Sequence, residues 1–244
     1  MQRTAEAVSL GHPDKIADYI SSYILDRIIE QDPQVKYAVE VLIKDNNVVL
    51  GGEVTTSAPL GDLTAYVKAA LAEIGYDDRI ETAIVAIPML QDEDLTDLIV
   101  SVLGERPEHI IVNGTGRYTY HGSIADCGIT GRKLACDFYS TACPIGGGSP
   151  WTKDASKADL TLNIYARILA CENLADNDEC FVYLSSCIGR SELPSGLVKT
   201  IKDGVVSTHN LWCNQKPSAL IKAYGLHKPI YADLCGKGIS GIMQ

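Results

Sequence analysis

The chain has 244 residues, 46% of them hydrophobic, and a formal net charge of −10 at pH 7. This size and composition predict a packed globular protein of one large domain or two small ones. The acidic balance argues against nucleic acid and anionic membranes as main partners. No apolar run approaches the roughly 20 residues that cross a bilayer. The N-terminus lacks a secretory pattern, so we expect a cytoplasmic protein without a membrane.

The first periodic segment is a helix predicted over residues 13–31, with Pro13 in its first turn. One apolar face recurs at every fourth position, which is typical of an α-helix. That face consists of Ile16, Ile20, Ile24 and Ile28. Alternating apolar residues then predict strands over 35–43 and 48–57, joined by a turn at 45–47. We expect a hairpin here.

The next elements are more widely spaced. They are a helix over 62–74, a strand over 80–87, a helix from Asp92 or Asp94 to about Gly104, and a strand over 108–113. The stretch from 113 to 151 is rich in Gly, Thr and Asp and has no regular period. Loops of this length usually carry function.

After this loop the regular pattern returns. It predicts a helix over 156–171, strands over 180–187 and 197–206, and a helix over 216–224. The order strand, turn, strand, helix therefore occurs near the start and again near the end. We predict an α+β fold of related modules, with helices covering one face of mixed or antiparallel sheets. The N-terminal module would span 1–107 and the C-terminal module 108–244, with the two interwoven.

All eight cysteines follow residue 126. None forms a Cys-x-x-Cys pair or lies at zinc-site spacing from a histidine. We interpret them as small buried side chains in a reducing compartment.

The first motif with chemical potential is Gly11-His12-Pro13-Asp14-Lys15, at the head of the first helix. A helix N-terminus offers free N–H groups and partial positive charge to a phosphate. His12 can donate a hydrogen bond or a proton, and Asp14 can hold Mg²⁺ through oxygen. Taken alone, the motif is equally compatible with an ordinary capped helix start.

The second motif is the block from Asp126 to Lys133. It combines an acid with adjacent Arg132 and Lys133, separated by glycines. Neighbours on a regular strand point to opposite faces, so only one cation would reach a common ligand unless the backbone is irregular. The alternative interpretation is a polar hairpin with a solvated basic end.

The third motif runs from Gly146 to Asp159 and contains three glycines, Lys153 and Lys157. It is not a Walker A loop, because Asp154 follows the loop lysine where Ser or Thr is required. If Ser156 caps the following helix, the loop delivers an anion to a second helix N-terminus. Across the three motifs, four cations and two carboxylates match the needs of a triphosphate with Mg²⁺.

Together these motifs resemble the methionine adenosyltransferases, or S-adenosylmethionine synthetases. The matching segments come in the family's order and cover residues 4–87 and 108–234. They are Glu6-Ala7-Val8-Ser9 leading into Gly11–Asp18, Gly51–Ala58, Asn113–Arg117, Asp126–Lys133, the triple-glycine loop, Pro217–Ile221 and Pro229–Tyr231.

The resemblance implies that methionine sulfur attacks the ribose 5′ carbon of ATP and expels triphosphate, which is then hydrolysed to pyrophosphate and phosphate. It implies two Mg²⁺ ions, one K⁺ ion, and a homodimer with active sites at the subunit interface. His12, Arg132, Lys133, Lys153 and Lys157 would be catalytic. The nucleotide would also contact Glu6, Lys15, Tyr118, Asp126 and Ile188. Methionine would contact Glu53 (from the partner subunit), Gln91, Lys157 and Ile188. Asp14 and Asp159 would hold magnesium, and Glu40 potassium.

The chain departs from the family pattern in several places. Residues 88–107 replace a large central region that normally supplies a gating loop, methionine contacts and an ATP-binding lysine. Leu10 stands in place of a usual glutamate, and Thr152 in place of a usual glycine. Two alternatives to an active synthetase remain from the sequence. One is a triphosphate hydrolase, and the other is a non-catalytic partner of a full-length synthetase.

Overall fold

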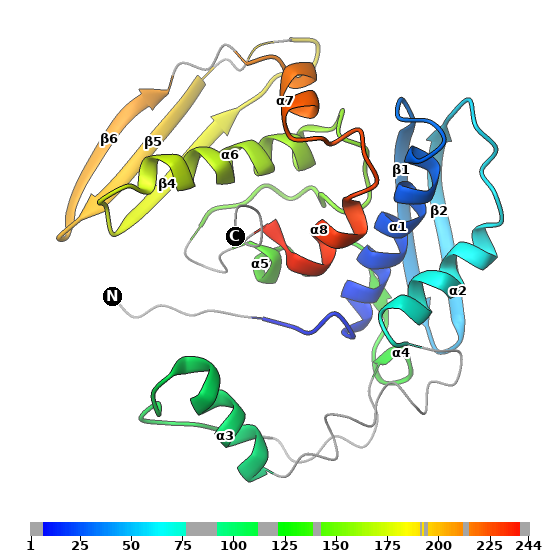
Figure 1. Ribbon diagram of the computed structural model, residues 1–244, viewed down its shortest axis with the longest axis horizontal. Helices are drawn as coiled ribbons and strands as arrows, with labels where there is room; N and C mark the ends of the chain where they lie inside the picture. The colour runs from blue at the N-terminus through cyan, green and yellow to red at the C-terminus, as the bar shows by residue number, and fades with distance from the viewer. Residues whose placement is uncertain are drawn as a thin grey trace.

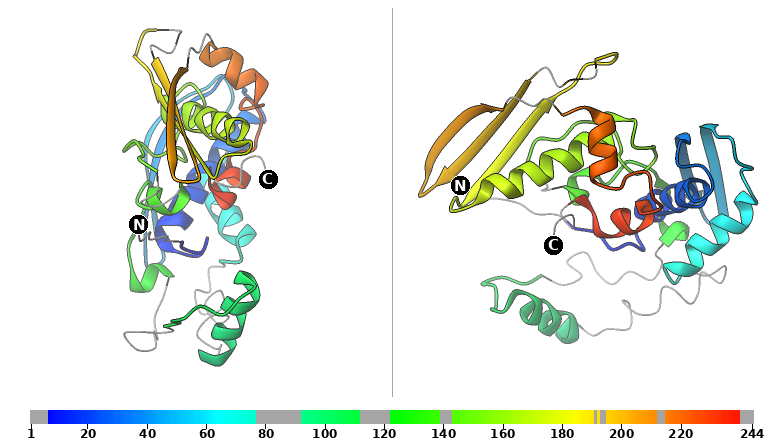
Figure 2. Two further views of the ribbon diagram at one scale, coloured as in Figure 1. Left: turned by 90° about the vertical axis from the view of Figure 1, so that its left-hand side faces the viewer. Right: turned by 45° about the horizontal axis from the view of Figure 1, so that its top comes forward.

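The computed structural model describes residues 7–76, 92–111, 122–138, 143–190, 192, 195–211 and 215–239. Two three-stranded antiparallel sheets, with strand orders β2-β1-β3 and β4-β5-β6, lie toward opposite ends of the molecule (Figure 1). Helices pack on these sheets, and the layers are visible in side view (Figure 2). The predicted α+β class is confirmed.

Helix α1 (Pro13–Ile29) is the centre of the larger core. All of its residues are buried except Tyr23 and Arg27. This is more than the single apolar face predicts, because β1, α2 (Leu63–Glu73) and α8 (Tyr231–Lys237) each pack against it. The helix begins where predicted and ends two residues earlier.

The sheet beside α1 is built on the predicted hairpin. Strands β1 (Lys36–Lys44) and β2 (Asn47–Thr55) pair along their full length, and β3 (Gly128–Ile129) pairs with the other edge of β1. Side chains alternate, so the Tyr37, Val39, Val41 and Ile43 face is buried. The other face carries Leu42, Val49 and Ile129, all exposed.

A second segment from the C-terminal half also joins β1. Lys153 bridges to Ala38, with the amide of Val39 donating to the oxygen of Thr152 and that of Asp154 to Tyr37. The edge of β1 therefore receives β3 at its end and the Lys153 segment near its start. Segments from the later half of the chain therefore join the sheet of the first half, and the division at residue 107 into two interwoven modules stays a prediction.

The other sheet contains β4 (Glu179–Ser185), β5 (Ser195–Lys202) and β6 (Val205–Leu211). Helix α6 (Ala158–Leu174) packs on it, with α7 (Pro217–Ala223) beside α6. The sequence prediction of one strand over 197–206 was wrong, because Asp203 and Gly204 both adopt positive φ in a two-residue turn. The chain reverses there and forms β6.

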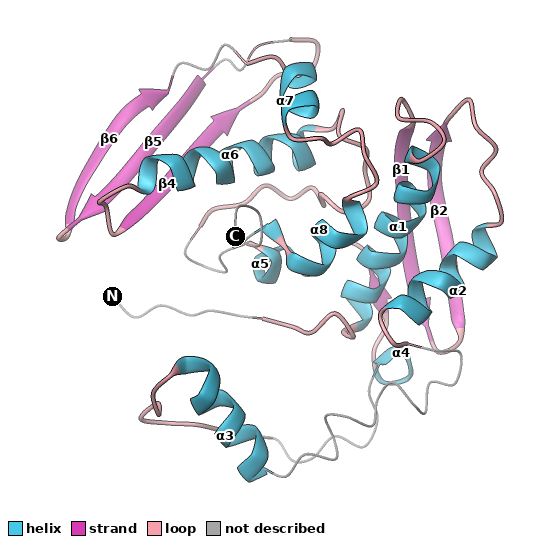
Figure 3. Cartoon of the chain, in the orientation of Figure 1, coloured by secondary structure: helices cyan, strands magenta, loops and turns pink. Residues whose placement is uncertain are grey.

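The remaining helices are short or peripheral (Figure 3): α3 (Asp92–Leu103), α4 (Gly122–Ala125) and α5 (Leu134–Asp137). Helix α3 was predicted, whereas α4, α5 and α8 were not. The strand predicted over 108–113 is absent from 108–111, the part that the structure describes. The strand predicted over 80–87 lies outside the described residues.

The described cysteines are all free thiols. Cys235 is buried in α8, but Cys187 is exposed and the other five are half-buried. The prediction that the cysteines are buried is therefore wrong for most of them. Among the described helices, none has the length and apolar character needed to cross a membrane.

Candidate functional site

The first part of the site forms at the start of α1. His12 is the N-cap residue, and its Nδ1 accepts a hydrogen bond from the amide of Asp14 at 3.1 Å. Pro13 occupies the first helical position, where the missing N–H costs nothing. Because Nδ1 accepts, the neutral imidazole carries its proton on Nε2. His12 therefore presents a donor at a helix N-terminus.

The carboxylate of Asp14 lies close to both cations of the second motif. Lys133 Nζ lies 2.6 Å from Oδ2 and Arg132 Nη1 lies 3.9 Å from Oδ1, while the amide of Ile129 donates to Oδ1 at 2.8 Å. The chain turns at Gly131, where φ is +75°, so Arg132 and Lys133 do not alternate as on a strand. The irregular backbone thus allows both cations to reach one carboxylate.

Electrostatics at this point favour an ionised acid beside a neutral histidine. Burial opposes ionisation of Asp14, yet the hydrogen bonds from Lys133 and the Ile129 amide lower its pKa below the usual value. Burial, helped by the charge of Lys133, lowers the pKa of His12. At neutral pH, His12 is therefore an uncharged hydrogen-bond donor.

The second part of the site surrounds Asp159, in the first turn of α6. Lys153 Nζ lies 2.5 Å from its carboxylate. The third glycine of the loop explains how the acid fits, because a Cβ on Gly148 would overlap the Asp159 carboxylate. The N-cap residue is Lys157, not Ser156 as the sequence suggested. The Lys157 side chain has no ion pair with any residue in the described part of the chain.

Glu40 stands between these two parts. It lies on the exposed face of β1, and its carboxylate accepts hydrogen bonds from the hydroxyls of Thr130 and Thr152, the latter at 3.3 Å. Thr130 precedes the Arg132–Lys133 pair by two residues, and Thr152 precedes Lys153. Glu40 therefore ties together the two segments that carry the cations.

The register of β1 gives the spacing. Ile129 pairs with Leu42, and Lys153 pairs with Ala38. Four residues of strand separate these partners, or about 13 Å at ~3.3 Å per residue. The segment that carries Arg132 and Lys133 and the segment that carries Lys153 therefore contact β1 at separate points along the same edge. Glu40 lies midway between these points.

Lys15 is placed differently from its predicted role. Its ammonium is buried and contacts Asp137 at 2.8 Å, Asp18 at 3.4 Å and the sulfur of Cys235 at 3.8 Å. It also lies 5.2 Å from the ring centre of Trp151. The ammonium of Lys15 therefore faces the core and its acidic partners, and not the surface where the predicted contact with ATP would lie.

This buried group titrates unusually. Burial, reinforced by the charge of Asp137, raises the pKa of Asp18 to about 7 against the pull of Lys15. Burial alone would lower the pKa of Lys15, but the nearby Cys235, Asp18 and Asp137 raise it, so Lys15 stays protonated. Replacing Lys15 by an apolar residue would leave buried carboxylates unpaired, at a cost of about 3–5 kcal/mol.

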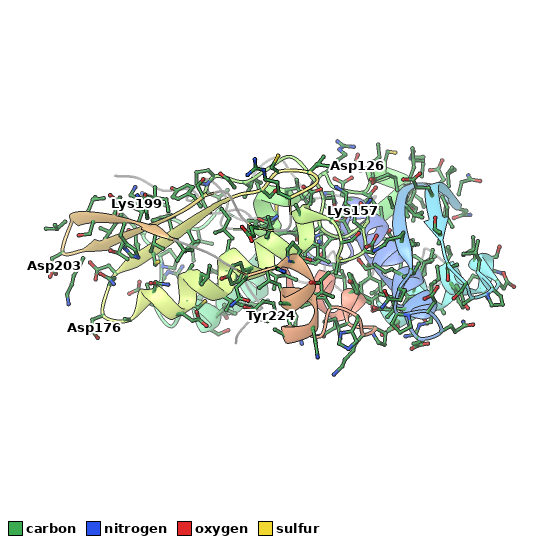
Figure 4. The ribbon with its side chains drawn as sticks, turned by 90° about the horizontal axis from the view of Figure 1, so that it is seen from above. Asp126, Lys157, Asp176, Lys199, Asp203 and Tyr224 are labelled. Carbon is green, nitrogen blue, oxygen red and sulfur yellow. The ribbon has the colours of Figure 1, made fainter. Side chains whose placement is uncertain are left out.

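The other predicted residues are less closely grouped. Glu53 shares the exposed face of the sheet with Glu40, because it pairs with Ala38 in the register. Asp126 is exposed, and it lies with Lys157 toward the half of the molecule that holds β1 (Figure 4). Ile188 is fully exposed in the loop after β4, with no packing on the described site. Glu6, Gln91 and Tyr118 lie outside the described residues.

Sequence reasoning missed several residues that shape the site. They are Thr130, Asp18, Asp137 and Trp151. Thr152 had been noted only as a departure from the family pattern, and the structure gives it a contact with Glu40. Thr130 beside the glycine turn at Gly131 was the available signal, but the partners of these residues come from distant parts of the chain.

Comparison with known proteins gives two kinds of match. Residues 1–91 match the family described as S-adenosylmethionine synthetase, N-terminal domain, and residues 120–243 match its C-terminal domain. Among solved structures, an unusual S-adenosylmethionine synthetase from Campylobacter jejuni is similar, with a TM-score of 0.78 and 24% sequence identity. The match covers 99% of this chain and 95% of that one, and shows a shared fold.

Proposed function

Because the chain belongs to the S-adenosylmethionine synthetase family, we propose that it makes S-adenosylmethionine from ATP and methionine. The observation that carries this proposal is the pair of acid–cation clusters along one edge of β1, joined through Glu40. Each cluster supplies one carboxylate for a metal and cations for a phosphate chain.

The triphosphate of ATP would be bound by Arg132, Lys133, Lys153 and Lys157. Lys133 and Lys153 now pair with Asp14 and Asp159, which holds both ammonium groups in place. Phosphate oxygens would join these pairs, so little rearrangement is needed. Such preorganised charge stabilises the leaving group most strongly in a partly buried site.

The donor set also fits Mg²⁺. In the described residues no three or more acidic, His or Cys side chains group together as a metal site. Magnesium is commonly held by one or two carboxylates together with substrate phosphates and water. Asp14 and Asp159, one in each cluster, suit that arrangement with ATP bound. The ions would neutralise charge on the phosphate chain.

A potassium ion would be held by the oxygens around Glu40. The exposed Glu40 carboxylate and the hydroxyls of the buried Thr130 and Thr152 form an oxygen-only set beside β1. The ion would offset the negative charge of Glu40 between the two clusters.

The reaction is a single displacement. The methionine sulfur would donate an electron pair to the ribose 5′ carbon, and the bond from that carbon to O5′ would break with its electrons on the triphosphate. His12 would donate its Nε2 proton in a hydrogen bond to the leaving oxygen. The cations would stabilise the growing charge, so catalysis would consist of positioning and electrostatics.

A second copy of the chain would complete the site. Leu42, Val49 and Ile129 form an exposed apolar patch on the sheet face that also carries Glu40 and Glu53. An exposed apolar face of this kind marks an interaction surface. A homodimer through this face would bring Glu53 of one copy to the methionine of the other.

Triphosphate hydrolysis without transfer is the second candidate. It is favoured by the full exposure of Ile188, which leaves that predicted adenine and methionine contact outside the described clusters. Both candidates use the same cations, but only the synthetase binds methionine and transfers the adenosyl group.

The test is to incubate the purified chain with ATP, methionine, Mg²⁺ and K⁺ and to measure S-adenosylmethionine by chromatography. Wild type should form it, and His12→Ala and Lys153→Ala should not. Phosphate release from tripolyphosphate without S-adenosylmethionine would instead support the hydrolase. If neither substrate turns over, the remaining interpretation is a non-catalytic partner of a full-length synthetase.

A further inference from the structure

A buried charged cluster lies directly behind the two parts of the site. It consists of Lys15, Asp18, Asp137 and Trp151, contributed by α1, α5 and the loop before α6. Figure 1 shows α8 beside α1, and α5 near the C-terminal end of α8. All four side chains are buried, and Asp18 and Trp151 have no exposed surface.

Asp18 reaches the first cation-bearing turn. Its Oδ1 accepts the backbone N–H of Gly131 at 2.8 Å, and its Oδ2 accepts from Lys15 at 3.4 Å. Gly131 immediately precedes Arg132 and Lys133. The turn has a positive φ at Gly131, so its direction depends on the contacts that hold that residue.

Asp137 reaches the second cation-bearing segment. Its Oδ1 accepts from Lys15 at 2.8 Å, and its Oδ2 accepts the indole N–H of Trp151 at 2.8 Å. The hydroxyl of Ser22 donates to the carbonyl of Trp151 at 2.9 Å. Trp151 precedes Lys153 by two residues, so this anchor fixes the start of the Lys153 segment.

We infer that Lys15, Asp18 and Asp137 are positioning residues that hold the two cation-bearing segments at a fixed separation for a polyphosphate. Lys15 is the common donor, and the second oxygen of each carboxylate accepts a hydrogen bond from one of the two segments. None of the three contacts the ligand. This inference rests on the proposed function. It means that buried residues of the core set the geometry of the phosphate site.

The effect of the hydrogen bond between Asp18 and the Gly131 amide can be distinguished from a general loss of stability. Asp18→Asn keeps an oxygen that accepts from Gly131, whereas Asp18→Ala removes it. A matched control is Asp26→Ala, on the same helix. Asp26 is also buried and accepts the amides of Tyr231 and Ala232 at 2.8 Å each, but it faces α8 and touches neither cation-bearing segment.

The experiment uses the full-length chain, with Mg²⁺ and tripolyphosphate as the probe. Affinity is measured by titration calorimetry, and backbone hydrogen exchange by mass spectrometry over residues 129–133. We expect Asp18→Ala to bind tripolyphosphate at least tenfold more weakly and to exchange faster at 129–133. Asp18→Asn should stay within threefold of wild type, which also keeps the test usable if Asp18→Ala folds poorly. Asp26→Ala should bind like wild type although its unfolding midpoint falls.

Equal weakening in Asp18→Ala and Asp26→Ala would overturn the inference, because the effect would then be general destabilisation. Unchanged affinity in Asp18→Ala would also overturn it. The proposed function fails separately, when wild type binds tripolyphosphate normally and Asp18→Ala weakens that binding, yet no S-adenosylmethionine forms.

Discussion

The ammonium of Lys133 lies 2.6 Å from the carboxylate of Asp14, although 119 residues separate the two in sequence. This pair places a cation at the N-terminus of α1, where His12 also presents a donor. The attraction holds Lys133 in place and keeps Asp14 ionised. It is the closest link between the first and second motifs.

Substitution of Lys133 by Met should therefore reduce kcat/KM for S-adenosylmethionine formation by about 10²–10³, the usual cost of removing one preorganised charge. The assay is product formation at several ATP concentrations. Lys237→Met is the control, because Lys237 pairs with Asp233 on the surface of α8. A threefold loss or less in Lys133→Met would contradict its role.

Gly148→Ala should damage the second cluster. The added methyl group would occupy the space of the Asp159 carboxylate and push it away from Lys153. Displacing a catalytic-site group by about 1 Å commonly lowers the rate about tenfold to a hundredfold. Gly147→Ala is the matched control, because nothing lies near its Cβ position. Activity assays and titration with Mg²⁺ would compare the two, and equal behaviour of both variants would refute the idea.

Glu40→Gln should remove the dependence of activity on potassium. The substitution eliminates the negative charge that the ion would offset while keeping the size of the side chain. We expect wild-type activity to rise with KCl at constant ionic strength, with NaCl as the balancing salt, and the variant to stay flat. Thr152→Val, which removes one hydroxyl from the same carboxylate, should weaken the response without abolishing it. A potassium response in Glu40→Gln equal to that of wild type would show that Glu40 does not hold the ion.

Asp32 should make the protein sensitive to acid. The amide of Ser57 and the hydroxyl of Thr56 both donate to it, and these bonds lower its pKa to about 2. A folded-state pKa below the unfolded value of about 4 means that its stabilisation is present above pH 4. That stabilisation is lost as pH falls from about 4 to 2.

Urea unfolding between pH 2 and 6 would measure this effect. Asp32→Asn should show a shallower loss of unfolding free energy with acid than wild type does. Asp62→Asn is a useful control, because Asp62 is an exposed helix cap with the same side chain. Identical slopes in wild type and Asp32→Asn would show that Asp32 does not contribute.

Local periodicity was enough to predict most of the regular elements. Helix α1, the β1–β2 hairpin, α2 and α6 all have apolar spacing that their packing then uses. The β5–β6 hairpin was missed because its turn, Asp203-Gly204, lies inside a run that otherwise alternates. A two-residue Asp-Gly turn is a strong hairpin signal, and here it outweighed the apolar pattern.

The site was predictable in composition but not in arrangement. Charge and the family resemblance pointed to Asp14, Lys133, Lys153 and Asp159, which the structure brings together in two pairs. The inward direction of Lys15 could not be read from sequence, because two of its partners, Asp137 and Cys235, lie more than 100 positions away. The ion pair between Arg132 and Asp14 likewise depends on the turn at Gly131, whose conformation is set by contacts in the folded protein.

The near-complete burial of α1 has a consequence for how this chain can change over generations. The same 17 residues form the centre of the core and include Asp14 of the site, so a random codon change there tends to harm folding and chemistry at once. Libraries aimed at altered substrates should leave this helix intact. Diversity is better placed at positions such as Gly146 and Gly147, where an added side chain meets open space.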